Sequence, residues 1–325
     1  MVLNSKLMTP SKPKTDQQRL PRTRRAKHPP AFRITERDVE LVRAVLSYRF
    51  LYTKQLYWLF PESSQQNLNV RLRHLYHHGY LDRVSLPDSK TNEQLVYAPT
   101  EKGAVMVAEA DGISREDVHW GRYMNQVSPT HIRHLLAIND VMVSYETALA
   151  GAQARGKVAD FKVVRGEPRK HKLPVMLKDR DGRRKRVAIV PDAFIAVKFD
   201  AKNYGVFFVE VDRATVGSSR WTEKVTVYRE YPRTEHFRSK YKGQWCIVLT
   251  VVPSDKRVMA LAAKTAGSGG QRGFWFTTAE QIAPDTALSR IWVRASELYG
   301  WRNESVELLS DYAQAKRSAL PDALR

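Results

Sequence analysis

The chain has 325 residues, 42% of them hydrophobic, and carries a formal net charge of +20. This composition suits two domains with packed cores, and the charge favours a polyanionic partner, most simply nucleic acid, over a basic protein such as a ribosome-associated factor. The single cysteine, Cys246, excludes a disulfide framework and a thiolate zinc site, and it fits a reducing, cytoplasmic setting. We expect neither a membrane span nor a secretory signal, because no apolar run has the required length.

Residues 1–30 are predicted to form a disordered basic arm. The stretch "KPKTDQQRLPRTRRAKHPP" is rich in Pro, Lys and Arg and contains one acid, Asp16. Such a composition buries too little apolar surface to order itself. The arm could lie along a phosphate backbone, or it could be a solubilising tail without a partner.

Residues 31–107 are predicted to form a winged-helix DNA-binding domain. Thr35 and Asp38 form a capping signal at the start of the first helix, and "TKQLYWLF" follows as a second helix. The third helix begins at Ser64 and turns Leu68, Leu72 and Leu75 inward. Two strands in "YLDRVSL" and "QLVYAP" then complete the hairpin, and "RLRHLYHHGYLDRV…YAPTEKG" resembles many bacterial winged-helix DNA-binding proteins.

The third helix is the predicted recognition helix of this domain. Gln, Asn and Arg can bond base edges in the major groove, and a lysine at the wing tip can contact phosphate. The alternative is a winged helix that binds protein. His74, His77 and His78 lack a carboxylate or cysteine spaced to complete a metal site, so we interpret them as packing or helix-surface residues. The predicted DNA-contacting residues are Gln65, Gln66, Asn69, Arg71, Arg73 and Lys90.

A linker over 108–127 is predicted to lead to an α/β domain over 128–302, followed by a C-terminal helical tail over 303–325. The domain opens with a helix capped by Ser128, and helices then alternate with strands in an order typical of a mixed sheet. A basic excursion between Arg169 and Arg186 is predicted to follow a DNA backbone, although a solvated charged surface is an equal alternative. Its candidate contacts are Arg183, Arg184, Lys185 and Arg186.

Three acids lie inside apolar runs of this domain: Asp192, Glu210 and Asp212. A hairpin turn over 201–203 places Asp192 opposite Asp212, and the even parity of all three acids puts them on one face. Clustered carboxylates repel each other, so a cation must lie among them. Either Mg²⁺ or Mn²⁺ would suit oxygen ligands. The alternative is an ion-pair network with Arg213, Arg220 or Lys224.

The acids resemble the site of the PD-(D/E)xK nucleases, which have a restriction-endonuclease-like fold. Pro191-Asp192 matches the first part of that motif and Glu210-Val211-Asp212 the second, but Asp212 stands where the lysine is usual. In some members the lysine lies on the following helix. The resemblance therefore implies Asp192, Glu210, Asp212 and Lys224 as catalytic residues, with Arg213 as a weaker substitute for the lysine.

Residues 33 to 252 also resemble the replication-relaxation family of plasmids and other mobile elements. The shared features are the winged helix, "HIRHLLAIND", "PDAF" and "FFVEVDR" before a lysine-bearing helix. The family implies a role in plasmid DNA relaxation, replication or mobilisation, with a nuclease-like second domain. His131 and Asp140 could be accessory site residues, or else a core histidine and a solvated acid.

Two functions are compatible with these patterns. The first is a metal-dependent DNA endonuclease or nickase that its winged helix directs to double-stranded DNA. The second is a catalytically inactive DNA-binding replication or transcription factor, which the missing x-Lys favours. A protein-binding adaptor fits the charge less well. The partners expected are double-stranded DNA and other replication or mobilisation proteins.

Overall fold

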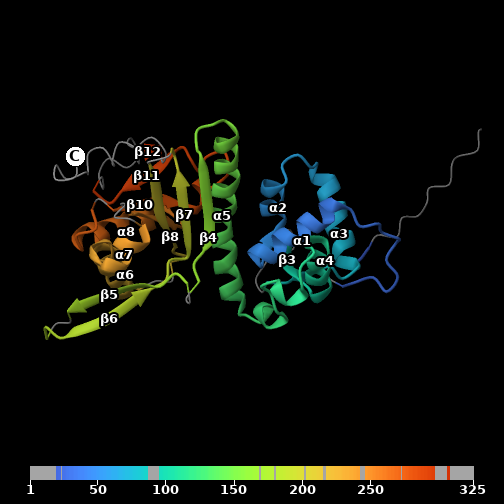
Figure 1. Cartoon of the computed structure of the whole chain (residues 1–325), viewed down its shortest axis with the longest axis horizontal. Helices are drawn as coiled ribbons and strands as arrows, with labels where there is room; N and C mark the ends of the chain where they lie inside the picture. The colour runs from blue at the N-terminus through green and yellow to red at the C-terminus, as the bar shows by residue number, and fades with distance from the viewer. Residues whose placement is uncertain are drawn as a thin grey trace, which may run out of the picture.

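The computed structural model describes residues 20–22, 24–86, 95–167, 170–178, 181–200, 203–214, 217–241, 246–271, 273–296 and 306–307. Two units lie on either side of one long helix, α5 (Pro129–Ala154), shown in green in Figure 1. Lys90, the first 19 residues of the predicted arm and most of the predicted C-terminal tail lie outside the described residues. Within that tail the structure describes a strand, β12 (Val306–Glu307), where a helix was predicted.

The N-terminal unit, residues 34–111, contains the three helices and the two-stranded hairpin that the sequence predicts. One further strand follows the first helix and pairs with the hairpin, which gives an antiparallel sheet of order β1-β3-β2. A fourth helix closes the unit. The elements are α1 (Glu36–Tyr48), β1 (Leu51–Tyr52), α2 (Thr53–Leu59), α3 (Gln65–His77), β2 (Leu81–Val84), β3 (Val96–Pro99) and α4 (Glu101–Asp111).

Capping and helical spacing explain how α1 and α3 are placed. The backbone N–H of Thr35 donates to Asp38 Oδ2 at 2.8 Å, which is the predicted capping box. Leu68, Leu72 and Leu75 of α3 are buried in one hydrophobic cluster with residues of α1. The inward face predicted for α3 is therefore confirmed.

The end of the predicted disordered arm is bound to the N-terminal unit, which corrects that prediction for these residues. Arg25 donates to the carbonyl oxygens of Tyr76 and Leu81, both at 2.9 Å. The backbone N–H of Ala26 donates to Nδ1 of the buried His77 at 3.0 Å. Hydrogen bonds to groups at the end of α3 and the start of β2 thus hold a segment that has little apolar surface.

The histidines of α3 take part in packing. His74 stacks on Phe32 with 4.8 Å between the ring centroids, and His78 lies 3.0 Å from the carbonyl oxygen of Pro30. Together with the buried His77, these contacts confirm the packing interpretation.

The predicted linker folds back on the N-terminal unit through two short turns, η1 (Arg115–Asp117) and η2 (Arg122–Asn125). Trp120 is buried and donates to Asn125 Oδ1 at 3.2 Å, while the Asn125 amide donates to the carbonyl oxygen of Pro99 at 2.9 Å. These bonds bring the chain to the start of α5.

Helix α5 contacts both units. Its buried Asn139 donates to the carbonyl oxygens of Tyr48 and Phe50 at 3.1 and 2.6 Å. In the opposite direction, Gln55 of α2 donates to the carbonyl oxygen of Leu136 at 2.9 Å. Because a buried amide without a partner is costly, these bonds fix the N-terminal unit against α5.

The α/β unit is built on a seven-stranded sheet of order β12-β11-β10-β9-β8-β7-β4. The pairs β8–β9 and β9–β10 are parallel and the others are antiparallel, so the predicted mixed sheet is confirmed. The strands are β4 (Asp160–Arg165), β7 (Ala193–Lys198), β8 (Tyr204–Val211), β9 (Cys246–Val252), β10 (Phe274–Thr278), β11 (Arg290–Arg294) and β12. The helices are α6 (Ser218–Glu230), α7 (Glu235–Tyr241) and α8 (Asp255–Gly267), with the short turns η3 (Tyr231–Arg233) and η4 (Ala279–Gln281).

Alternate residues of β8 face different helices. Phe207 and Val209 belong to the hydrophobic cluster that includes α5, whereas Phe208 packs against Tyr228 of α6 with 5.6 Å between the centroids. Figure 1 shows α5 on one face of the sheet and α6, α7 and α8 on the other. Even-numbered residues of β8, including Glu210, therefore face α6.

The pairing of β7 with β8 differs from the predicted register by two residues. Ala193 pairs with Val209 and Lys198 with Tyr204, whereas the prediction placed Asp200 opposite Tyr204. Asp200 lies in the turn, where its carboxylate accepts from the backbone N–H of Asn203 at 2.8 Å. A shift of two residues keeps each side chain on its face, but it moves Asp212 past Asp192 along the strand.

The basic excursion is a β-hairpin that projects from the sheet (Figure 1). Its strands are β5 (Leu173–Lys178) and β6 (Arg184–Ile189), and they form a separate two-stranded sheet. In the part of the chain that the structure describes, no helix combines the length and the apolarity needed to cross a membrane.

Candidate functional site

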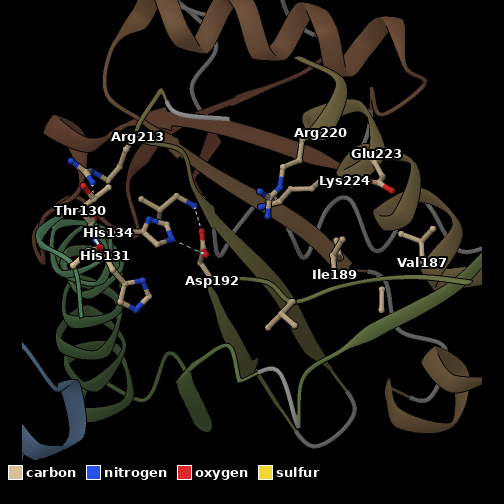
Figure 2. A pocket seen from close by; sticks show the side chains of 14 residues that line it. Thr130, His131, His134, Val187, Ile189, Asp192, Arg213, Arg220, Glu223 and Lys224 are labelled. Carbon is tan, nitrogen blue, oxygen red and sulfur yellow. Dashed lines mark hydrogen bonds and ion pairs between the residues drawn. The ribbon is translucent and has the colours of Figure 1, made fainter. Parts of the chain in front are cut away.

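A cavity of about 690 Å³ opens at the end of the sheet where β7 begins and β8 ends. Its walls come from the first turns of α5 and α6, from β6 and from residues next to β7 and β8. Figure 2 shows Arg220 and Lys224 reaching from α6 toward Asp192, while His134 approaches the same carboxylate from α5. The first turn of a helix carries partial positive charge, so this end of the sheet favours anions.

Asp192 is the one member of the predicted acid cluster that lines the cavity. Its Oδ2 accepts from the backbone N–H of Val211 at 2.8 Å, and its Oδ1 lies 3.2 Å from His134 Nε2. The Asp192 side chain keeps 17% of its surface exposed. One carboxylate is therefore oriented from two sides and remains accessible from the cavity.

Glu210 lies behind Lys224, at 2% exposure. Its Oε2 pairs with Lys224 Nζ, and its Oε1 accepts from the Tyr228 hydroxyl at 2.6 Å. Burial raises the pKa of Glu210, the positive charge of Lys224 opposes this rise, and the negative charge of Asp192 adds to it. Asp192 is thus close enough to influence the buried pair.

Lys224 balances both acids. Burial alone would lower its pKa, but the charges of Glu210 and Asp192 outweigh burial and raise it. Lys224 therefore stays protonated at neutral pH and supplies the positive charge that the adjacent carboxylates require. This outcome matches the ion-pair alternative for Glu210, with Lys224 as the predicted cation.

Asp212 is not part of this cluster, which corrects the prediction of three acids at one site. Its Oδ2 accepts from Arg257 Nε of α8 at 2.5 Å, and the carboxylate is buried. The shift in strand register separates Asp212 from Asp192. Within the described residues, no group of three or more His, Cys, Asp or Glu side chains is placed to hold a metal ion.

The rest of the cavity wall carries more positive than negative side chains. Arg213, Arg220, His131 and His134 line it, with Glu223 as one further acid. Arg213 donates to the carbonyl oxygen of Thr130 at 3.1 Å and so joins the end of β8 to the start of α5. This excess of positive side chains favours the binding of a phosphate group in the cavity.

The model of the replication-relaxation family matches residues 42–245, which include most of the N-terminal unit, the residues that line the cavity and the α/β unit as far as α7. The chain belongs to the replication-relaxation family. Membership associates it with the replication or relaxation of plasmid or mobile-element DNA. Comparison with curated proteins found no match, and neither did comparison with solved structures.

Within this replication-relaxation protein, His134 is a cavity residue that the sequence did not single out. The prediction considered His131 and Asp140 on the same helix. His131 lines the cavity and is not a core histidine, whereas Asp140 is largely buried and accepts from Gln55 at 3.0 Å, so it is not a solvated acid. The sequence places His131 and His134 in the first turns of a helix capped by Ser128. It does not show which of the two histidines contacts Asp192.

Most of the residues predicted to read DNA lie on the open side of α3. Gln65, Gln66, Asn69 and Arg73 are exposed. Arg71 instead turns inward, where its Nε donates to Asp38 Oδ1 at 2.8 Å and a terminal nitrogen pairs with the other oxygen. Asp38 is fully buried, so Arg71 has a structural role in this arrangement.

Replacing Arg73 and Arg71 should therefore have different effects. We expect Arg73→Ala to weaken duplex binding by about 1–3 kcal/mol if the side chain reads a base, with no change in unfolding. Arg71→Ala should lower the free energy of unfolding by about 3–5 kcal/mol, because the buried Asp38 loses its cation and keeps only its hydrogen bonds from Thr35. Fluorescence anisotropy and urea unfolding of each variant measure the two effects. Unchanged duplex affinity for Arg73→Ala at several salt concentrations would show that α3 does not contact DNA.

The basic residues of the hairpin lie next to the cavity. Arg183, Arg184, Lys185 and Arg186 are exposed. The residues that follow in the same strand, Val187 to Ile189, form part of the cavity wall. These exposed charges lie beside the cavity wall. Their contact with a DNA backbone stays a prediction.

Proposed function

We propose that the N-terminal unit is a winged helix that binds double-stranded DNA, and that the cavity is the site of a metal-dependent DNA endonuclease or nickase. The observation that carries the proposal is the cluster of Asp192, Glu210 and Lys224 at the end of the sheet. Asp192 directly precedes β7, Glu210 lies on β8 and Lys224 on α6, and the charges of Asp192 and of the Glu210–Lys224 pair influence one another. The pKa values of Glu210 and Lys224 are both raised, and titratable groups with perturbed pKa values beside a cavity are typical of catalytic sites.

The order of elements supports a restriction-endonuclease-like fold for the α/β unit. With the β5–β6 hairpin, the turn η3 and the short helix α7 set aside, the chain runs α5, β4, β7, β8, α6, β9. This is a helix, three antiparallel strands, a helix and a parallel strand, as in the PD-(D/E)xK nucleases that the sequence resembles. Asp192 and Glu210 then take the positions of the two motif acids, and Lys224 takes that of a lysine moved to the helix.

Two carboxylates fit a divalent cation better than the three first predicted. Mg²⁺ is commonly held by one or two carboxylates, with water and substrate phosphate in the other positions. Asp192 lines the cavity and Glu210 lies behind it, next to Lys224, whereas Asp212 is bound to Arg257. We assign the proposed Mg²⁺ or Mn²⁺ ligands to Asp192 and Glu210.

The side chains of the cavity would share the remaining work. A bound Mg²⁺ or Mn²⁺ ion would activate water and polarise the scissile phosphate. Arg220 and Lys224 would bind the phosphate oxygens and stabilise the charge that develops on them. His134, whose Nε2 lies 3.2 Å from Asp192 Oδ1, would orient the carboxylate.

A second function, a DNA-binding replication or transcription factor without catalysis, is favoured by one observation. Lys224 and Tyr228 occupy both carboxylate oxygens of Glu210, as a purely structural ion pair would. In that case the cavity would bind DNA phosphate without cleaving it.

Supercoiled plasmid incubated with the protein and Mg²⁺ or Mn²⁺ separates the two functions. A nuclease converts supercoiled DNA to nicked or linear forms, and EDTA abolishes the conversion. An inactive factor shifts the DNA in a gel but leaves it supercoiled. Linear and branched DNA belong in the same assay, since absence of cleavage on all three substrates would contradict the nuclease proposal.

A further inference from the structure

Two arginines meet where the N-terminal unit joins α5 and β4. Arg165, the last residue of β4, donates to the carbonyl oxygen of Tyr48 at 2.7 Å and also to Asn139 Oδ1. Tyr48 is the last residue of α1, and Arg49 follows it directly. The side chains of Arg49, from the N-terminal unit, and Arg165, from the α/β unit, therefore both lie where the two units join.

Neither arginine has a compensating carboxylate. Among the described residues, no ion pair involves Arg49 or Arg165. The Nε atoms of both side chains are buried without a hydrogen-bond acceptor. Burial, together with the positive charge of Arg49, lowers the pKa of Arg165 to about 10. Two partly buried like charges with free donors are costly unless an anion binds between them.

The backbone at Arg49 adds to this cost. Its φ of 70° and ψ of −44° lie outside the regions that residues with a side chain usually adopt. A glycine would fit this position without strain. An arginine in a conformation that favours glycine indicates a role for the side chain, since strained residues concentrate at ligand-binding sites.

We propose that Arg49 and Arg165 form a binding site for a phosphate group of the DNA backbone. Both arginine side chains are partly exposed, and guanidinium groups match the geometry of phosphate oxygens. The site borders the cavity, because His131 lines the cavity and lies close enough to both arginines for their charges to lower its pKa. DNA bound along this seam would contact the N-terminal unit and the cavity together. The assignment to DNA, but not the phosphate site itself, rests on the proposed DNA-binding function.

Thermal unfolding in inorganic phosphate tests the site with Arg49→Gly. Phosphate should raise the unfolding midpoint of the wild-type chain above that in sodium chloride of equal ionic strength. Arg49→Gly should lose this rise, while its midpoint without phosphate stays equal to or above that of wild type, because glycine relieves the strain. Arg49→Lys should keep part of the rise, and Arg238→Gln, an exposed arginine on α7, should keep all of it.

Binding of a 20-base-pair duplex tests whether DNA supplies the phosphate. Each phosphate contact contributes about 0.9 to the slope of log affinity against log salt, so Arg49→Gly should flatten the slope by about that amount. An unchanged slope would overturn the assignment to DNA. A wild-type midpoint that phosphate does not raise, or an Arg49→Gly midpoint that it raises equally, would overturn the site. Loss of the phosphate effect in Arg49→Gly without any plasmid cleavage would support the site while contradicting the nuclease.

Discussion

Lys224→Met should lower the free energy of unfolding at pH 7 by about 3–5 kcal/mol, because it leaves a buried carboxylate without its cation. Glu210 is 2% exposed, and the Lys224 side chain that covers it is 17% exposed, so water screens the pair weakly. Urea unfolding measures the loss. Lys264→Met, on the exposed side of α8, is the matched control and should stay within about 0.5 kcal/mol of wild type.

The same variant should lose less stability at acid pH. Burial already raises the pKa of Glu210 above its ordinary value of 4.5, and removal of Lys224 should raise it further. Between the ordinary and the raised pKa the native state binds more protons than the unfolded state, so stability increases as the pH falls. The deficit of Lys224→Met should therefore be smaller at pH 5 than at pH 7. The double variant with Lys224→Met and Glu210→Gln should recover most of the stability at pH 7. If Lys224→Met alone has the same unfolding midpoint as wild type, the pairing is contradicted.

Local patterns predicted many of the helices and strands of this fold, but not the short strands β1 and β12. The capping signal at Thr35 and the leucine stripe of α3 each depend on residues that are neighbours in sequence. The register of β7 and β8 depended on where the turn begins. The Asp200 carboxylate bonds the turn to Asn203, and this longer turn moved the pairing by two residues.

The partners of the three acids were less accessible from sequence. Lys224 lies on α6, the helix that follows the strand of Glu210, and it was among the predicted cations. Arg257 lies 45 residues after Asp212, on α8, and was not predicted. His134 comes 58 residues before Asp192 and contacts it because the first turns of α5 lie at the end of the sheet where β7 begins. Contacts over such separations follow from the packing of helices on the sheet, which periodicity alone does not specify.

Asp192→Asn should lower the rate at which supercoiled plasmid is cleaved by about 10²- to 10⁴-fold, while duplex affinity remains unchanged. Asp192 lines the cavity, and its carboxylate is held by the backbone N–H of Val211 and by His134. Asparagine keeps an oxygen for Val211 but lacks the negative charge that a divalent cation requires. The exposed Asp285, which lies outside the cavity, supplies the control variant Asp285→Asn, and this should cleave as wild type does.

Thermal unfolding with and without Mn²⁺ separates a metal ligand from a structural acid at this position. A ligand predicts that Mn²⁺ raises the unfolding midpoint of wild type and of Asp285→Asn, but not that of Asp192→Asn. A structural acid predicts that Asp192→Asn unfolds at a lower temperature and that Mn²⁺ stabilises none of the three proteins. In the second case the cavity would bind DNA phosphate through Arg220 and Lys224 alone, and the chain would act as a DNA-binding factor.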